Sequence, residues 1–219
     1  MQRRQAAAFF DIDGTLLSTN SAPLYAKYLR RHGLARRRDL LRAGWYLAQY
    51  RLGRLDIEKA AEKAGGNIRG QREVDVAAFA ERWYREMVRG YLVPQVCTLL
   101  AEHQAAGDLV AILSSTTAYL AEPLSRDLRV EHLLVTRLET EAGRFTGRVI
   151  APICYGEGKV IHARNFASEH GVDLDESWFY TDSITDLPVL ELVGKPRVVA
   201  PDRLLRRESQ RRGWPVIDP

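Results

Sequence analysis

Cysteine is scarce in this sequence: Cys97 and Cys154 are the only two among 219 residues. Two cysteines without metal-ligand spacing exclude a disulfide-rich or zinc-based scaffold. The chain also lacks an uncharged run of the roughly 20 residues that a membrane-spanning helix requires, since the longest such run covers 109–121. The apolar part of the start, MQRRQAAAFF, ends at Asp11, too early for a secretory signal. We therefore expect a reduced, cytoplasmic protein without a membrane span.

Lysine is rare as well, since only five of the 32 basic residues are lysines, and the formal net charge is +4. Arginine clusters occur at 30–31, 36–38, 206–207 and 211–212. Such clusters are typical of surfaces that bind nucleic acid or acidic membranes, but also of solvated helix faces in an arginine-rich chain. No aromatic-interleaved basic repeat accompanies them, so we expect no nucleic-acid partner.

Short apolar runs alternate with helical patterns along most of the chain. The apolar runs, each followed by polar or turn residues, lie at 6–10, 109–113, 132–135, 178–180 and 197–199. The helical patterns lie at 95–106, 117–128, 158–170 and 186–193. This alternation predicts an α/β fold with a doubly wound, mostly parallel, Rossmann-like sheet.

Two segments interrupt the alternation. Residues 18–91 contain only amphipathic helical stretches, which predicts an all-helical cap domain inserted after the first strand. We expect the catalytic core to comprise residues 1–17 and 92–219. The segment RLETEAGRFTGRVIAPI alternates around Gly143, which predicts a small β-hairpin.

Polar residues follow three of the predicted strands, at the sheet edge where doubly wound folds bind ligands. These residues are Asp11 and Asp13, then Ser114 and Ser115, then Asp182 and Asp186, while Lys159 opens the helix before the fourth strand. Four carboxylates in one small site require a cation, and all-oxygen ligands suit Mg²⁺. Magnesium beside hydroxyls and a lysine is typical of a phosphoryl site. One of the paired aspartates can then attack phosphorus, and the other can move the proton.

In this order and spacing, the motifs resemble the haloacid dehalogenase superfamily. They are DIDGT at 11–15, an apolar residue before Ser114, Lys159 at a helix start, and Asp182 followed by Asp186. GRFTGRV, GEGK and YTDSITDLPVL are similar to the phosphoserine phosphatase-like subfamily, and the long insertion is similar to a helical cap of the first type. The resemblance extends from about residue 6 to residue 200.

The resemblance implies a Mg²⁺-dependent phosphatase that acts on a small phosphorylated metabolite. Asp11 would be the nucleophile and Asp13 the general acid and base. The metal would be held by Asp11, the Asp13 backbone carbonyl and Asp182, with support from Asp186 directly or through water. The phosphoryl group would be bound by Thr15, Ser114, Ser115 and Lys159.

The sequence departs from that subfamily where its substrate amine and carboxylate are held. The positions of the expected cap glutamate and arginine carry Asn20 and Ala64, unless Glu58 and Arg54 have taken over the two roles. Asn20 could still hydrogen-bond a substrate. These changes argue against phosphoserine and favour a neutral, hydroxylated or aromatic leaving group. The fourth motif also carries Ser183 and Thr185 in place of glycine and asparagine.

Several alternatives remain open from the sequence. They include phosphoserine phosphatase proper, a phosphotransferase that uses the same aspartyl phosphate, a receiver-type signalling domain and a non-catalytic nucleic-acid module. Aromatic residues of the insertion are candidate pocket walls or core packing: Tyr25, Tyr28, Trp45, Tyr46 and Tyr50. The oligomeric state is expected to be monomer or homodimer.

Overall fold

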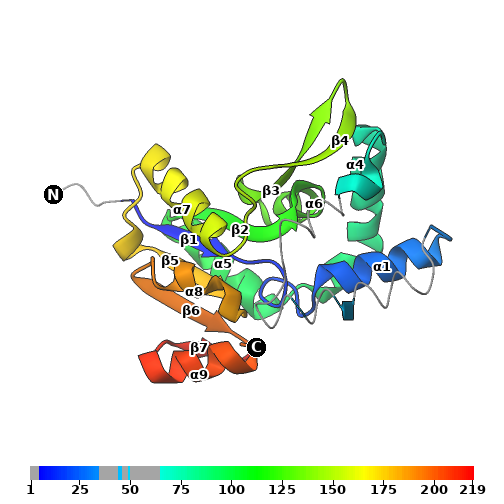
Figure 1. Cartoon of the computed structure of the whole chain (residues 1–219). Coiled ribbons are helices and arrows are strands. Elements are labelled where there is room, and N and C mark those ends of the chain that lie inside the picture. Colours follow the sequence, from blue (N-terminus) through cyan, green and yellow to red (C-terminus); the bar gives the residue numbers. More distant parts are fainter. Residues whose placement is uncertain (1–4, 35–43, 46–48, 50–64) are drawn as a thin grey trace.

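The computed structural model describes residues 5–34, 44–45, 49 and 65–219 (Figure 1). Seven strands form one sheet in the order β4-β3-β2-β1-β5-β6-β7. Every neighbouring pair is parallel except β3 and β4. The strands are β1 (Ala7–Phe10), β2 (Leu109–Thr117), β3 (His132–Glu141), β4 (Arg144–Ile150), β5 (Trp178–Thr181), β6 (Lys195–Val199) and β7 (Val216–Ile217).

Helices cover both faces of this sheet. Successive side chains of the central strand β1 point to opposite faces, and both sets are buried beneath these helices. Ala8 and Phe10 belong to one apolar cluster, with side chains of α5 (Pro94–Ala106) and α6 (Ala118–Leu128). Ala7 and Phe9 belong to a second cluster. This cluster also contains side chains of α7 (Glu157–His170), α8 (Leu187–Leu190) and α9 (Arg203–Arg212). The predicted doubly wound α/β fold is confirmed.

The hairpin predicted around Gly143 is also confirmed. Strand β3 pairs with β2 through its first half and with β4 through its second half. The turn contains Ala142 and Gly143, both with positive φ, at 48° and 71°. A single long strand therefore serves the parallel sheet and then extends beyond it into the hairpin, which projects from the sheet in Figure 1.

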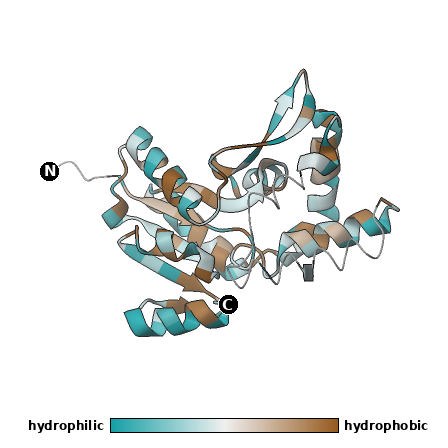
Figure 2. Ribbon diagram, viewed as in Figure 1, coloured by the Kyte–Doolittle hydropathy of each residue, from teal (hydrophilic) through white to brown (hydrophobic). Residues whose placement is uncertain are grey.

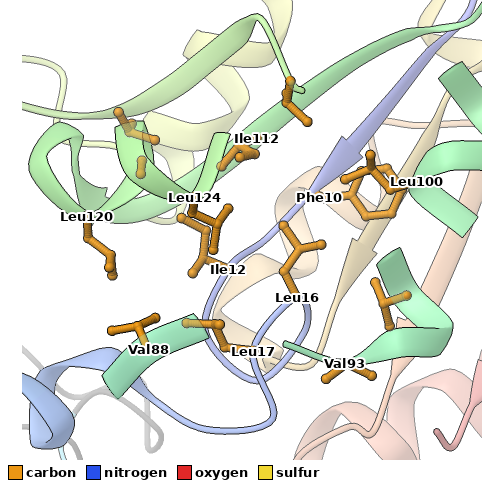
Figure 3. Close-up of a cluster of buried hydrophobic side chains, with 14 of the residues drawn as sticks. Phe10, Ile12, Leu16, Leu17, Val88, Val93, Leu100, Ile112, Leu120 and Leu124 are labelled. Carbon is orange, nitrogen blue, oxygen red and sulfur yellow. The ribbon is translucent and has the colours of Figure 1, made fainter. Parts of the chain in front are cut away.

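The described part of the insertion contains α1 (Ser21–Arg31), α4 (Glu73–Trp83), a π-helical segment at Tyr84–Val88 and a 3₁₀ turn at Arg89–Tyr91. Side chains from these segments join the same apolar cluster as Phe10. Figure 3 shows Leu16 and Leu17 packed between Ile12, Val88 and Val93 at this junction. The described part of the insertion thus packs against α6 and the loop that follows β1, and the division at residues 18–91 stays a prediction.

The aromatic side chains of the insertion pack mainly with one another. The Tyr25 ring lies 4.9 Å from that of Trp83, and the Tyr28 ring lies 5.3 Å from that of Phe79, centroid to centroid. Tyr28 also donates a hydrogen bond to Glu86, at 3.0 Å. Trp45 is 58% exposed. Core packing therefore accounts for Tyr25 and Tyr28, whereas Tyr46 and Tyr50 lie outside the described residues.

Two elements near the C-terminal end were not expected from the sequence. Strand β7 has only two residues, too few to show a period. Helix α9 is mostly hydrophilic (Figure 2), so its pattern resembles a solvated segment rather than a core helix. Across the described ranges, no helix combines the length and apolar character needed to cross a bilayer.

Candidate active site

The register of the parallel strands brings the predicted polar residues to one edge of the sheet. Phe10 of β1 lies opposite Ile112 of β2 and Tyr180 of β5, so the residues that follow these positions leave the sheet side by side. The backbone N–H of Asp11 donates to the Tyr180 carbonyl at 3.0 Å. Asp11, Ser114 and Asp182 are therefore placed around a common point at the carboxyl ends of the strands, as the sequence predicted.

Lys159 connects two of the aspartates. Its Nζ donates to Asp11 Oδ1 at 3.1 Å and to Asp186 Oδ2 at 2.8 Å, and the lysine and Asp186 side chains are fully buried. Thr181 Oγ1 also donates to Asp186 Oδ2, at 2.6 Å. Burial raises the pKa of Asp186, and the neighbouring ammonium opposes that rise. These contacts fix the Asp11 carboxylate against a cation that water cannot reach.

The start of α7 explains how Lys159 reaches this position. Gly158 packs so closely that a Cβ there would lie 1.8 Å from the carbonyl oxygen of Ile153. Only glycine permits this approach, which places the next residue at the sheet edge. The glycine before Lys159 in GEGK thus has a steric role.

Asp13 is held by the first residue of α1. The Ser21 backbone N–H donates to Asp13 Oδ1 at 2.8 Å, and the Ser21 hydroxyl donates to Oδ2 at 3.0 Å. Loss of hydration raises the pKa of Asp13 to about 7, with a further contribution from the charge on Asp11. The two hydrogen bonds oppose this rise. A carboxyl group with this pKa can exist in both protonation states near neutral pH.

Asp182 lies directly against the loop that carries Asp11 and Asp13. A Cβ on Gly14 would lie 2.1 Å from Asp182 Oδ2, and the Gly14 φ of 76° is itself unfavourable for other residues. The pKa of Asp182 is raised well above its usual range, first by burial and then by the charges of Asp11, Asp186 and Asp13. The charges of the neighbouring carboxylates thus make Asp182 harder to ionise.

The crowded carboxylates fit a divalent cation. In the described part of the chain, no three His, Cys, Asp or Glu side chains form a complete ligand cluster. The predicted set needs only two carboxylates, Asp11 and Asp182, with the Asp13 carbonyl and waters, which is typical of Mg²⁺. Burial, followed by the charges of neighbouring carboxylates, raises the pKa values of Asp13 and Asp182, and a bound cation would favour their ionised forms.

The predicted phosphoryl-binding hydroxyls lie at the same edge. Ser114 is 1% exposed, and among the described residues its Oγ has only long hydrogen bonds, at 3.4 Å, to Thr116. Thr15 is fully buried, and its Oγ1 has no hydrogen-bond partner within the described residues. The Ser115 carbonyl accepts a hydrogen bond from Thr136, at 2.9 Å, which anchors the irregular end of β2.

Asn20 has a structural role that sequence reasoning did not assign to it. Its Oδ1 accepts a hydrogen bond from the Ala22 N–H at 3.0 Å and so caps α1. The side chain also lines a cleft of about 650 Å³ that opens beside Asp13, Gly14 and Asp182. Its side-chain oxygen is already hydrogen-bonded, so the amide NH₂ is the group that remains to contact a substrate.

Sequence reasoning missed several residues that line the cleft. Asp202, Arg203 and Arg207 line it, and Asp202 caps α9 by accepting from the Leu204 and Leu205 N–H groups at 2.8 Å. Asp202 also accepts from the Ile184 N–H at 2.8 Å, and its own N–H donates to the Asp182 carbonyl at 2.8 Å. The Pro-Asp-Arg sequence before a helix was an available N-cap signal.

Curated relatives match nearly the whole chain. A probable phosphatase of Mycobacterium tuberculosis is 34% identical over 98% of this chain and 76% of its own length. The histidinol-phosphatase of Neisseria meningitidis is 31% identical over 96% of this chain and 97% of its own length. A phosphoserine phosphatase of Mycobacterium tuberculosis is 32% identical over 97% of this chain and 70% of its own length.

Among solved structures, a protein of unknown function from Bordetella pertussis superposes with a TM-score of 0.89. It is 35% identical, and the match covers 99% of each chain. The sequence profile described as haloacid dehalogenase-like hydrolase matches residues 8–191, which include all four predicted motifs. This chain therefore belongs to the haloacid dehalogenase-like hydrolase family.

Proposed function

We propose that this protein is a Mg²⁺-dependent phosphatase that hydrolyses a small phosphorylated metabolite through an aspartyl phosphate on Asp11. The observation that carries the proposal is the buried contact of Lys159 with Asp11 and Asp186 beside Asp13 and Asp182. The relatives support a phosphatase, since they include a histidinol-phosphatase and a phosphoserine phosphatase as well as a probable phosphatase.

In the first step, the Asp11 carboxylate attacks phosphorus. A bond forms between a carboxylate oxygen of Asp11 and phosphorus, and the bond from phosphorus to the leaving oxygen breaks. The contact from Lys159 to Oδ1 holds the carboxylate in one orientation, and burial excludes competing water from that side. Oδ2 is the oxygen that this contact leaves for attack.

Asp13 moves the proton in both steps. It gives a proton to the leaving alkoxide and then takes one from the water that hydrolyses the aspartyl phosphate. Its pKa of about 7 suits both directions, and the two hydrogen bonds from Ser21 fix the carboxyl group. Ser21 is thus a positioning residue that the motif alone did not identify.

The remaining roles follow from charge and hydrogen-bonding capacity. Asp11, the Asp13 carbonyl and Asp182 would hold Mg²⁺, which when bound neutralises charge on the phosphoryl oxygens. Lys159, Ser114, Thr15 and the strand end at Ser115 are suited to bind those oxygens. The buried Thr15 hydroxyl would gain in a phosphoryl oxygen the partner that it lacks in the described residues. Asp186 uses Oδ2 for Lys159 and Thr181, so we assign it to orienting Lys159 and to supporting the metal site.

The identity of the substrate depends on the residues that would hold its leaving group. Asn20 carries no charge and caps α1, so it offers no counter-ion for a phosphoserine ammonium. Three further residues lie outside the described part of the chain. They are Ala64, at the expected arginine position, and the possible replacements Arg54 and Glu58. Phosphoserine phosphatase proper is therefore the alternative rather than the first choice, although one relative bears that name.

The test is phosphate release from a panel of phosphomonoesters, measured with Mg²⁺ and with excess chelator. The expected result is Mg²⁺-dependent release that the Asp11→Asn variant loses. A parallel assay with an added alcohol acceptor distinguishes a phosphotransferase, because it would form a new phosphoester at the expense of free phosphate. Release that is unaffected by the Asp11→Asn change would contradict the proposal.

A further inference from the structure

We infer that Arg203 and Arg207 of α9 form a subsite for a second anionic group on the substrate, a carboxylate or a second phosphate. The inference rests on the proposed phosphatase function and narrows its substrate class. It assigns specificity to the core side of the cleft, whereas sequence reasoning looked for specificity residues only in the insertion.

The position of the two arginines is the first observation. Both line the cleft of about 650 Å³ that also contains Asp13, Gly14 and Asp182, and both side chains are exposed. They are one helical turn apart on α9, so their Cα atoms are separated by about 6 Å along the helix axis. Two arginines thus line the same cleft as Asp13, the residue that would protonate the leaving oxygen.

The pairing of charges on α9 is the second observation. The other arginines of this helix have acidic partners: Arg206 contacts Asp218 at 2.6 Å, Arg211 contacts Glu208, and Arg212 contacts Glu208 and Glu191. Within the described residues, neither Arg203 nor Arg207 has a hydrogen bond or ion pair. The three arginines of α9 outside the cleft are therefore paired with acidic residues, whereas the two that line the cleft are not.

Within the described residues, the nearest acid in the cleft forms no ion pair with either arginine. Asp202 is beside Arg203 in the chain, but its Oδ1 accepts from the Leu204 and Leu205 N–H groups and its Oδ2 accepts from the Ile184 N–H. Asp182, whose carbonyl accepts from the Asp202 N–H, belongs to the crowded carboxylate cluster. An anion from solution is the partner that the two guanidinium groups lack.

The anion in question differs from the phosphoryl group that reacts. That group lies at Asp11, where Lys159 already supplies a buried positive charge. Guanidinium groups bind carboxylate and phosphate oxygens through paired, charge-assisted hydrogen bonds. A substrate with an anionic group on its alcohol portion would thus be held at both ends. The expectation of a neutral leaving group came from the insertion alone and did not include α9.

Electrostatic attraction of any phosphate dianion is the main competing explanation. Exposed arginines raise the encounter rate of all anions, and added salt screens this effect. A subsite instead discriminates between substrates that share one skeleton and differ in the second group. A suitable series is 2-hydroxyethyl phosphate, phosphoglycolate, ethylene glycol bisphosphate and phosphoethanolamine.

The experiment measures kcat/KM for this series in the wild-type protein and in Arg203→Gln/Arg207→Gln. The matched control is Arg206→Gln/Arg211→Gln, which removes the same charge from the same helix outside the cleft. In the wild type, phosphoglycolate or the bisphosphate should exceed 2-hydroxyethyl phosphate by about tenfold or more. The cleft variant should lose that preference through a higher KM, and the control should keep it.

Three outcomes would overturn the inference: an unchanged preference in the cleft variant, an equal loss for all substrates that salt abolishes, or an equal loss in the control. Comparison of phosphoglycolate with ethylene glycol bisphosphate shows whether a carboxylate or a second phosphate fits the subsite better. Absence of phosphate release from every substrate by the wild type would contradict the proposed phosphatase function itself. Hydrolysis of 2-hydroxyethyl phosphate by all three proteins shows that this function is intact when the subsite is judged.

Discussion

The Nζ atom of Lys159 lies 3.1 Å from Asp11 Oδ1, and both side chains are almost completely buried. These residues are separated by 148 positions in the chain. The parallel sheet brings them together, since Asp11 follows β1 and Lys159 lies in the first turn of α7. The contact gives the candidate nucleophile an orientation and a counter-charge, and it can be tested separately from catalysis.

Replacing Lys159 with methionine should destabilise the metal-free protein. Asp11 and Asp186 would become buried carboxylates without a cation, which costs about 3–5 kcal/mol when one partner of a buried pair is removed. Denaturant unfolding in the presence of chelator measures this loss. In Lys159→Met/Asp186→Asn, part of the stability should return while activity stays lost. Wild-type stability in the single variant would contradict the assigned ion pair.

The Asp13 carboxyl should make the metal-free protein less stable as the pH rises. Its pKa is about 7 in the folded protein, against 3.8 as its ordinary value, chiefly because the group has lost hydration. Between these values the folded state binds more protons than the unfolded state, so the contribution is full below about pH 4 and is lost as the pH rises through about 7.

Thermal unfolding in chelator, followed from about pH 4 to pH 8, measures this effect. Other buried acids add slopes of the same sign, so the informative quantity is the difference between wild type and Asp13→Asn. The variant should show a smaller decline of Tm with pH. Parallel curves for the two proteins would show that Asp13 has an ordinary pKa.

Substituting alanine for Gly14 should damage the metal site more than the fold. The added Cβ would lie 2.1 Å from Asp182 Oδ2 and would displace that carboxylate. Gly107→Ala is the matched control, because Gly107 also has a positive φ, 80°, but has open space around its Cβ position. Both variants should lose about 1 kcal/mol from backbone strain.

The two glycine variants should differ in their Mg²⁺ requirement. Gly14→Ala should need a much higher Mg²⁺ concentration for half-maximal activity or be inactive, whereas Gly107→Ala should keep the wild-type value. A similar Mg²⁺ dependence in both proteins would place Asp182 outside the metal site.

Calcium should inhibit the Mg²⁺-activated enzyme. Ca²⁺ takes more oxygen ligands at longer distances than Mg²⁺, so it can engage both oxygens of Asp11 and remove the nucleophile. Phosphate release at fixed Mg²⁺ should fall as Ca²⁺ is added and recover when Mg²⁺ is raised. Full activity in excess chelator, or activation by Ca²⁺, would contradict the metal assignment.

The main acidic residues could be predicted because their local sequence determines their position. Asp11 and Asp182 directly follow short buried strands, and parallel strands end at the same edge. Asn20 illustrates the opposite case. Its position in the chain indicated a substrate contact, which stays a prediction, but not the hydrogen bond from the Ala22 N–H that makes it a helix cap. Such competition between local capping and ligand binding is not visible in residue spacing.

The cleft side of α9 could not be predicted for a different reason. Its arginines are similar in sequence, and only the fold distinguishes the two that face the cleft from those paired with Asp218, Glu208 and Glu191. Strand β7 was missed because two residues carry no periodic signal. Tertiary placement, rather than composition, therefore decides which positive charges are available to a ligand.

The most direct test of the account is to trap the phosphorylated enzyme. The protein is mixed with Mg²⁺ and a hydrolysable phosphomonoester, quenched in acid during turnover, and treated with borohydride, which reduces an acyl phosphate to an alcohol. Peptide mass spectrometry should then find this reduction at Asp11, and the Asp11→Asn variant should show neither the reduced residue nor turnover. Continued turnover by Asp11→Asn at more than about a tenth of the wild-type rate, or reduction at another residue, would contradict the central role of Asp11.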